Sequence, residues 1–402
     1  MTEEARLARG LLTSAAVRER AHELMEIALA DGLAEWRVDL DRLPAAADLT
    51  AEVVRTNYPD LKVPFHARWR HFVVGGRDLW AEQMDVQPMA AHPFADKEEA
   101  ARAAFDLVIP SVLLDAGAGA TWRYHDATTD AVLTRSEGLG VASLRMFQAG
   151  GFSSDPTRPL QADALARVDA EALAQAFQVT PENPLVGLEG RAALVRRLGE
   201  VVGRPARLFD LMKSRAEDGK LPAPVILATL LEELGPIWPG RVSLGGVPLG
   251  DCWRHPALKR ADATDGLVPI HKLSQWLAYS LIEPLQAAGL EITDIDGLTG
   301  LAEYRNGGLF VDARVLVLKE PGDANRSHPV DGPLVVGWRA LTVALLDRLA
   351  PLVRERLGVA AADFPLARVL EGGSWAAGRR LARERRADAS PPIAVLSDGT
   401  VF

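Results

Sequence analysis

The sequence predicts a mainly α protein, a compact multi-helix body in two lobes with a few short strands and no large sheet. About ten segments repeat apolar residues at intervals of three and four, the spacing that buries one face of a helix, against roughly three or four short strand-like runs. Gly or Pro stands near the ends of the helical segments, as is usual where helices stop. No fixed-period repeat occurs, which argues against a solenoid.

The composition is that of an acidic globular protein. The 402 residues suffice for about two or three domains or one large helical body, and 48% apolar with 25% charged residues is ordinary. The net charge of -9 argues against nucleic acid as a partner, because phosphate binding needs a basic face. One cysteine, Cys252, excludes an intramolecular disulfide and fits a reducing cytoplasm.

No targeting or membrane signal is visible. No apolar run approaches the roughly 18 residues of a membrane span. The acidic N-terminus differs from a signal peptide. We therefore expect a cytoplasmic, soluble protein without a membrane partner.

Residues 1–150 are expected to form an N-terminal helical lobe. The first helix begins at Thr13 or Ser14 and stops at Gly32. The other expected elements are a weak strand at 36–40, a short helix at 50–57, a helix at 96–114 with a kink near Pro110, and a helix starting at Arg135 and Ser136. A Gly/Ser/Pro loop at 147–159 marks the boundary.

Residues 151–402 are expected to form a C-terminal helical lobe. Helical spacing covers 162–176, 188–202, 204–216, 222–234, 270–288, 335–357 and 375–386. The lobe also contains the loop-rich region 235–269 and the segment 266–312, which holds the candidate site.

The helix at 270–288 has an unusual second face. One face carries an apolar stripe of leucines at every fourth position, which predicts burial, and Pro284 is expected to kink the last turns. The other face carries Lys272, Gln275, Trp276, Tyr279 and Glu283. A surface helix would have Glu and Lys there, so this mixture of side chains favours a pocket wall.

The segment 299–310 concentrates polar groups beside two glycines. Thr299 is expected to cap a short helical turn that ends at Gly307 and Gly308. Glu303, Tyr304, Arg305 and Asn306 then lie together. A carboxylate among such donors can be held ionised and meet positive charge on a substrate. Alternatively, Glu303 and Arg305 form an ion pair that only fastens two helices.

Two further stretches combine flat rings with hydrogen-bonding groups. In the stretch 64–72, which ends at Phe72, the residues Arg68, Trp69, Arg70 and His71 fit recognition of a sugar, base or carboxylate. On its own this stretch favours the alternative, a half-buried structural segment with extended arginines. The loop 235–269 carries Asp251, Trp253 and His255 just before the helix at 270–288, which favours a lined ligand cavity.

A metal site is the alternative for this loop. Cys252 and His255 have a C-x-x-H spacing, and His271 is a possible third ligand. A structural zinc site needs four ligands, so the spacing alone is weak. No nucleotide-binding glycine motif, G-x-S-x-G elbow or H-E-x-x-H motif occurs. We therefore expect neither a cofactor nor a metal.

Several motifs resemble the uracil-catabolism protein family, whose members act in a pyrimidine degradation route through ribosylurea. These motifs are HKLSQWLAYSLIEPL, LTGLAEYRNGGLFVD, WRALTVALLDRLA, LEGGSWAAGR and the closing SDGTVF, with WRHF at 69–72, RSEG at 135–138 and FSSD at 152–155. The resemblance spans nearly the whole chain.

A more distant similarity links HKLSQ, LTGLAEYR and WRALTV to the queuosine-salvage nucleoside hydrolases, which are helical and related in shape to DNA glycosylases. Their counterpart of AEYR reads ADYR, with a carboxylate that faces the ribose, so the resemblance assigns that role to Glu303. The chain departs from this pattern in having Glu for Asp, and Asn306-Gly307-Gly308 for a Val-Pro-Gln run.

The resemblance implies a metal-independent hydrolase that cleaves a ribosyl C–N bond of N-ribosylurea or a related riboside or nucleotide-derived substrate, yielding ribose and urea. Such a reaction passes through a cationic sugar that a carboxylate stabilises. Glu303 and Arg305 are then the candidate catalytic residues. The further residues expected to share their cavity and bind substrate are Trp69, Arg70, His71, Phe72, Asp251, Trp253, His271, Lys272, Gln275, Tyr304 and Asn306.

Two other functions remain open. A ureide or amide hydrolase would use a metal or a Cys or Ser nucleophile. A non-catalytic small-molecule-binding protein would have a structural Glu303–Arg305 pair.

Overall fold

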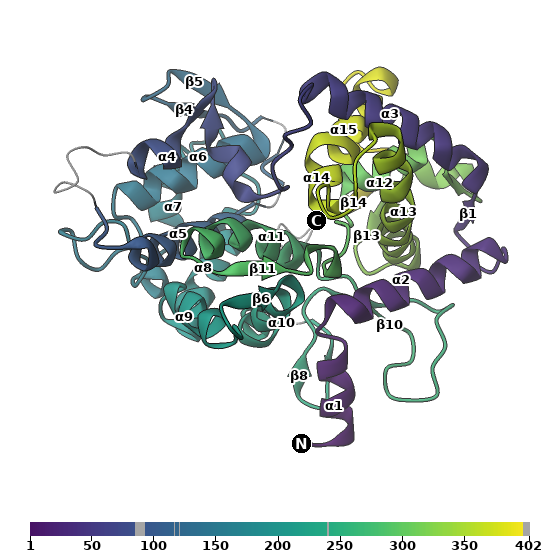
Figure 1. Cartoon of the computed structure of the whole chain (residues 1–402), viewed down its shortest axis with the longest axis horizontal. Coiled ribbons are helices and arrows are strands. Elements are labelled where there is room, and N and C mark those ends of the chain that lie inside the picture. The colour runs from purple at the N-terminus through teal and green to yellow at the C-terminus, as the bar shows by residue number, and fades with distance from the viewer. Residues whose placement is uncertain (85–92, 116, 120, 239–240, 397–402) are drawn as a thin grey trace.

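The computed structural model describes residues 1–84, 93–115, 117–119, 121–238 and 241–396, and over these residues the protein is mainly α, as predicted (Figure 1). The closing SDGTVF at 397–402 lies outside this part of the chain. The helices are α1 Glu3–Gly10, α2 Ser14–Leu29, α3 Leu43–Asn57, α4 Leu79–Met84, α5 Lys97–Leu113, α6 Arg135–Gln148, α7 Ala170–Ala176, α8 Leu188–Val202, α9 Ala206–Ser214, α10 Ala223–Leu234, α11 Lys272–Ala287, α12 Tyr304–Asp312, α13 Pro333–Leu357, α14 Leu366–Val369 and α15 Trp375–Arg385.

Strands in the described residues occur only as two-stranded pairs, so no large sheet forms there. The antiparallel pairs are β1 Trp36–Val38 with β12 Leu316–Leu318, β2 Val73–Val74 with β3 Arg77–Asp78, β4 Tyr124–Asp126 with β5 Ala131–Leu133, β7 Ser243–Leu244 with β8 Val247–Pro248, and β9 Cys252–Arg254 with β10 Leu267–Pro269. The parallel pairs are β6 Lys220–Pro222 with β11 Glu291–Thr293, and β13 Ser327–Pro329 with β14 Ala394–Leu396.

The helices gather in two halves (Figure 1). In one half α2 and α3 pack against α13, and α12 packs against α15. In the other half α5 packs against α6 and α9, and α11 packs against α5 and α10. Each half therefore draws helices from both sides of residue 150, and the packing does not follow the expected division into 1–150 and 151–402.

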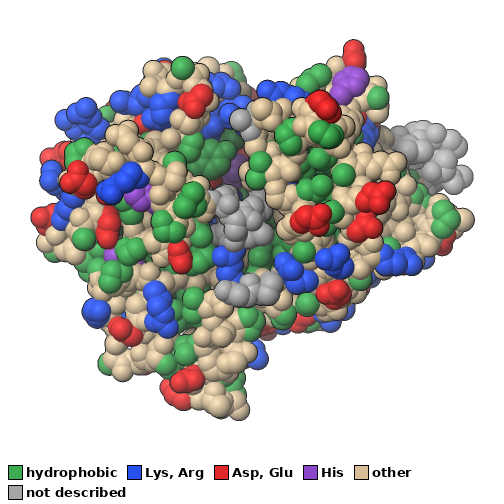
Figure 2. All heavy atoms as spheres, turned by 180° about the vertical axis from the view of Figure 1, so that it is seen from behind, with side chains coloured by type: hydrophobic (Ala, Val, Ile, Leu, Met, Phe, Trp, Pro, Cys, Tyr) green, Lys and Arg blue, Asp and Glu red, His purple; other side chains and the backbone are tan. Residues whose placement is uncertain are grey.

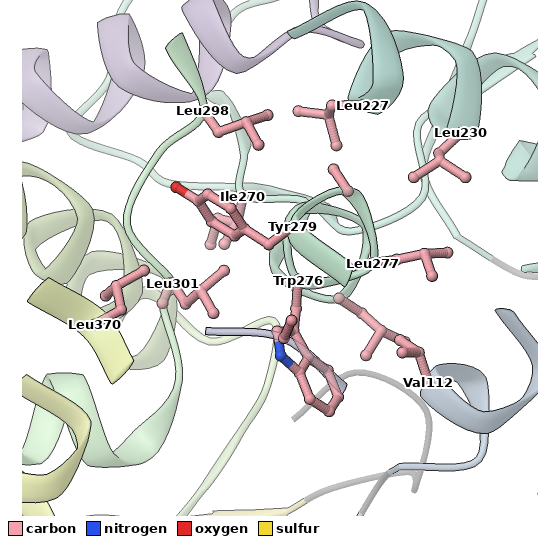
Figure 3. Close-up of a cluster of buried hydrophobic side chains, with 14 of the residues drawn as sticks. Val112, Leu227, Leu230, Ile270, Trp276, Leu277, Tyr279, Leu298, Leu301 and Leu370 are labelled. Atoms are coloured by element: carbon pink, nitrogen blue, oxygen red, sulfur yellow. The ribbon is translucent and has the colours of Figure 1, made fainter. Parts of the chain in front are cut away.

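The helix α11 is buried on all sides rather than on one stripe. Figure 3 shows Trp276, Leu277 and Tyr279 projecting to different sides of it. The Tyr279 hydroxyl donates to the Thr299 carbonyl at 3.0 Å, and the Gln275 amide donates to the Thr299 hydroxyl at 2.7 Å. Two of the five side chains on the expected polar face, Gln275 and Tyr279, are therefore bonded to the segment that leads into α12.

Pro284 does not interrupt α11, which continues to Ala287. Proline lacks the N–H that would bond the carbonyl four residues earlier, that of Ser280. The indole N–H of Trp69 donates to this carbonyl instead, at 2.7 Å, and the Arg68 backbone N–H bonds the Ser280 hydroxyl at 2.9 Å. A neighbouring segment thus satisfies the group that Pro284 leaves unpaired.

The helix α12 corrects the expected turn that ends at the two glycines. Glu303 is its N-cap, and the helix runs through Gly307 and Gly308 to Asp312. A Cβ on Gly307 would lie 2.8 Å from the Trp338 ring, and one on Gly378 of α15 would lie 2.0 Å from the Arg305 carbonyl oxygen. Glycine at these positions permits close helix packing rather than ending the helix.

The surface carries both charge signs. On the face drawn in Figure 2, Lys and Arg side chains are interspersed with Asp and Glu. Among the described residues, no helix is both long and apolar enough to cross a membrane.

Candidate functional site

A cavity of about 460 Å³ lies where segments from both halves meet. Glu303, Tyr304 and Arg305 line one wall, at the start of α12. Lys272 and Trp276 of α11 also border it. Four further polar side chains come from the segments around α5 and α6: His71, Asp115, Arg135 and Ser136. Figure 2 shows a hollow between the halves with hydrophobic and histidine side chains inside it.

Glu303 is held by the main chain of α12. Its carboxylate accepts the backbone N–H of Arg305 at 2.7 Å and that of Asn306. Burial raises the pKa of Glu303, while these N–H groups and the charge of Lys272 act in the opposite direction. The side chain is therefore fixed at the positive end of a helix and borders the cavity.

Glu303 and Arg305 do not form the ion pair that the structural alternative requires. The Arg305 guanidinium donates to the Ala389 carbonyl at 2.9 Å and lies 4.8 Å from the centre of the Tyr304 ring. No ion pair joins Arg305 to Glu303 in the described part of the chain. Arg305 therefore fastens the segment around Ala389 to α12.

Lys272 is a cation of the same cavity whose charge acts on Glu303. Its backbone N–H donates to the Asp251 carboxylate at 2.9 Å, which fixes the start of α11, while its side chain lines the cavity. Burial lowers the pKa of Lys272, and the charges of Glu303 and Asp115 oppose that effect. Among the described residues its ammonium has no hydrogen-bond or ion-pair partner.

Aromatic rings line the space beside these charges. The ring of His66 lies 6.3 Å from both Trp276 and Trp375, and its Nδ1 lies 2.6 Å from a Glu371 oxygen. The indole N–H of Trp276 is buried without a partner among the described residues. Flat walls with a spare donor suit a small polar ligand such as a sugar.

Another part of the cavity wall is built around Arg68, whose side chain is fully buried. Its guanidinium forms an ion pair with Asp115 at 2.9 Å and lies 3.5 Å from His71 Nδ1. Ser136 donates to the second Asp115 oxygen at 3.0 Å. Asp115, Ser136 and His71 border the cavity.

Asp251 and Trp253 do not line this cavity, although both were expected there. Arg339 pairs with both Asp251 oxygens at 2.8 Å, and the Trp253 indole donates to Asp251 at 2.6 Å. Burial raises the pKa of Asp251, but Arg339, the Trp253 indole and the Lys272 backbone N–H together outweigh it and lower that pKa to about 2. The network anchors α11 through the Lys272 backbone, so its role in the fold is to position Lys272.

Three other expected binding residues are also buried away from the cavity. His271 Nε2 bonds the Leu11 carbonyl at 3.0 Å. Gln275 bonds Thr299, as described above. Asn306 donates to the Leu301 carbonyl at 3.1 Å and accepts from the Ser374 hydroxyl at 2.8 Å. Each satisfies main-chain or hydroxyl groups inside the protein.

The aromatic segment 69–72, just before β2, lies partly at the cavity and partly away from it. Only His71 of its expected residues reaches the cavity. Trp69 and Arg70 line a separate depression, where Arg70 pairs with Glu283 at 2.7 Å. Phe72 is fully buried, edge-on to Trp69 at 5.7 Å. The charged and aromatic mixture of this stretch therefore mostly serves packing.

The described residues contain no group of three or more His, Cys, Asp or Glu that could hold a metal ion. Cys252 is buried, and burial raises the pKa of its thiol. His255 lies 3.9 Å from Glu35, and His271 bonds a main-chain carbonyl. Cys252, His255 and His271 therefore have different neighbours and do not form a shared ligand set in the described part of the chain.

Trp276 borders the cavity, as the polar face of its helix predicts. Five other residues that border it are not predicted from the sequence: His66, Asp115, Arg135, Ser136 and Trp375. Arg135 opens the RSEG motif, which is visible in the sequence. In the structure it also has a left-handed φ of 53°, a conformation that costs energy for a residue with a side chain.

Comparison with known proteins places the chain in a family. It matches the family described as "Protein of unknown function (DUF1688)" over residues 10–402. It is 38% identical to Protein urg3 of Schizosaccharomyces pombe over 402 residues, covering 98% of each chain. It is 36% identical to Uracil catabolism protein 4 of Lachancea kluyveri over 411 residues, covering 91% of this chain and 92% of that protein. The chain therefore belongs to this family, the uracil-catabolism family that its motifs resemble.

Proposed function

We propose that the protein is a metal-independent hydrolase that cleaves the ribosyl C–N bond of N-ribosylurea or a closely related riboside. Glu303 is the central residue of this proposal. The carboxylate stabilises the oxocarbenium-like sugar and takes up a proton from the attacking water. Lys272 helps to keep Glu303 ionised while the sugar is bound.

One observation carries the proposal. Glu303 borders the cavity with both carboxylate oxygens fixed by backbone N–H groups and without the Arg305 pair that would make it purely structural. A preorganised charge of this kind needs no reorientation when charge develops on a substrate. The name of one relative, Uracil catabolism protein 4, supports a place in uracil catabolism, and the aromatic walls suit a ribosyl ring.

The experiment is turnover of N-ribosylurea by purified protein treated with a chelator and then dialysed. We expect release of ribose and urea in equal amounts, unchanged by chelation. The control is the same protein preincubated with the chelator and then supplied with excess Zn²⁺, which would restore activity to a metal enzyme.

Other outcomes separate the alternatives. Release of ammonia and a shortened riboside would indicate cleavage within the ureido group instead. Saturable binding of N-ribosylurea without any product would indicate a binding protein. Either result would overturn the proposal.

A further inference from the structure

We propose that His71 and Asp115 bind the departing ureido group, His71 donating to its carbonyl oxygen and Asp115 accepting from its N–H groups. This inference rests on the proposed ribosyl C–N hydrolysis and assigns the part of the cavity wall formed by His71 and Asp115 to the leaving group.

The first observation is the orientation of Asp115. Arg68 donates to one of its oxygens at 2.9 Å and the Ser136 hydroxyl donates to the other at 3.0 Å. Burial raises the pKa of Asp115, but the nearby basic groups, Arg68 first among them, together outweigh it and the pKa is lowered. The carboxylate therefore stays ionised, and each of its oxygens keeps lone-pair capacity for a further donor. Because Asp115 borders the cavity, a ligand N–H can use that capacity.

The second observation fixes the proton on His71. A guanidinium can only donate, so the Arg68 group 3.5 Å from His71 Nδ1 makes this nitrogen the acceptor and places the proton on Nε2. Burial and then Arg68 lower the pKa of His71 to about 4, so the ring is neutral at physiological pH. His71 thus presents a neutral N–H donor to the cavity.

The third observation is the cost of this arrangement. Arg68 is fully buried with only one carboxylate partner, and its Nη2 has no hydrogen-bond partner among the described residues. A buried, incompletely paired charge is weak as a source of stability. Here it orients Asp115 and His71 toward the cavity at the same time, which gives the buried charge a function.

The donor and acceptor pair match the chemistry of a ureido group. Such a group has one carbonyl acceptor next to N–H donors, which is the complement of one N–H and one carboxylate. Lys272 is influenced by the charges of both Glu303 and Asp115, so the two carboxylates border the same space. A ribosyl ring between the walls would have Glu303 on one side and its leaving group on the other.

The bond changes balance with one water molecule. The C1′–N bond breaks and its electron pair leaves on the ureido nitrogen, where it spreads onto the carbonyl oxygen that His71 binds. The water oxygen forms the new bond to C1′ and one of its protons passes to Glu303. The ureido nitrogen takes one proton from solvent, Glu303 later releases its proton to solvent, and the products are ribose and urea.

The test compares two leaving groups in the full-length protein. N-ribosylurea needs help to expel its nitrogen, whereas a nitrophenyl β-ribofuranoside releases a stable nitrophenolate. We expect His71→Phe, which keeps a ring but no nitrogen, to lower kcat for N-ribosylurea about 100-fold and for the aryl riboside less than about 5-fold. His71→Gln, which retains an N–H donor, is expected to recover part of the loss, and Asp115→Asn to show the same selectivity as His71→Phe.

A matched control separates a leaving-group role from loss of a buried ion pair. Asp126 resembles Asp115, since it pairs with Arg145 at 2.8 Å and accepts a hydrogen bond from the Thr129 hydroxyl at 2.8 Å. Unlike Asp115, it does not line the cavity. Asp126→Asn is expected to lower Tm as Asp115→Asn does, without changing the ratio of the two kcat values.

A second measurement covers the case in which wild-type protein does not accept the aryl riboside. Urea is then tested as a competitive inhibitor of N-ribosylurea turnover. His71→Phe and Asp115→Asn are expected to raise the urea inhibition constant at least 10-fold, and Asp126→Asn to leave it unchanged. Equal losses on both substrates, or an unchanged inhibition constant, would overturn the leaving-group assignment. Absence of wild-type turnover of N-ribosylurea would instead reject the proposed function.

Discussion

Trp69 donates its indole N–H to the Ser280 carbonyl 2.7 Å away, the carbonyl that Pro284 cannot bond. This relationship makes Trp69 part of the support for α11 rather than part of a binding surface. It also explains how a proline is accommodated inside a helix that carries Lys272 and Trp276 to the cavity.

The first prediction follows from this bond. Trp69→Phe removes the donor but keeps an aromatic ring, so it is expected to reduce the free energy of unfolding by about 1–3 kcal/mol, the usual cost of a buried unpaired carbonyl. Turnover per folded molecule is expected to stay near wild type. Denaturant unfolding and active-site-normalised kinetics measure the two quantities.

A double-mutant cycle isolates the cause. Pro284→Ala restores a backbone N–H that can bond Ser280, so Trp69→Phe is expected to cost less in that background. An equal cost with and without Pro284 would mean that Trp69 acts only through packing.

The second prediction concerns Asp251 and Arg339. The folded pKa of Asp251 is about 2, below the ordinary 3.8, so the ion pair contributes stability that is present above pH 3.8 and lost as the pH falls toward 2. The shift corresponds to about 2 kcal/mol. Asp251→Asn is expected to lower stability at pH 7 by at least that amount, because it removes the charged partner of both terminal nitrogens of the buried Arg339 guanidinium.

The pH dependence checks this assignment. The stability difference between wild type and Asp251→Asn is expected to shrink as the pH is lowered from 4 toward 2, measured by denaturant unfolding at each pH. A difference that does not change with pH would show that the carboxylate charge is not what stabilises the start of α11.

The sequence predicts features set by neighbouring residues better than features set by residues far apart in the chain. The helices at 270–288 and 335–357 follow from periodicity, since their apolar spacing is local, and the structure has them as α11 and α13. The placement of Asp251 does not follow, because its partner Arg339 is 88 positions away. The place of Asp115 at the cavity does not follow from the sequence either, because its partner Arg68 is 47 positions away.

In α12 a local signal in the sequence predicts the wrong helix end. Gly307 and Gly308 predict a helix end, but the helix continues through both, and tertiary packing against Trp338 uses the missing Cβ of Gly307 inside the helix. Glu303 as N-cap was also not expected, since Ser, Thr, Asp and Asn are the usual caps. The sequence shows that residues 303–306 lie together, but their hydrogen bonds can be assigned only from the folded structure.

The third prediction is the effect of Glu303 on stability. Its folded pKa is raised above 4.5, so its protonated form favours folding, and this contribution is present below about pH 4.5 and lost as the pH rises through the folded pKa. Glu303→Gln has no such loss. We therefore expect its Tm relative to wild type to increase between pH 4.5 and pH 7.5.

Asp96 supplies the control for this effect. It caps α5 through two backbone N–H groups, at 2.8 and 2.9 Å, but is exposed. Asp96→Asn is expected to show no comparable gain with rising pH. A relative Tm of Glu303→Gln that instead falls with rising pH would mean that the ionised carboxylate stabilises the fold.

The most direct measurement of the central claim is the turnover of N-ribosylurea by Glu303→Gln under conditions in which both proteins are fully folded. The substitution keeps the size and one backbone acceptor but removes the charge that stabilises the cationic sugar. We predict that kcat falls by roughly 10²–10³, about 3–4 kcal/mol, while the Kd for substrate changes much less. A Glu303→Gln protein with near-normal kcat would contradict the account, whatever its stability.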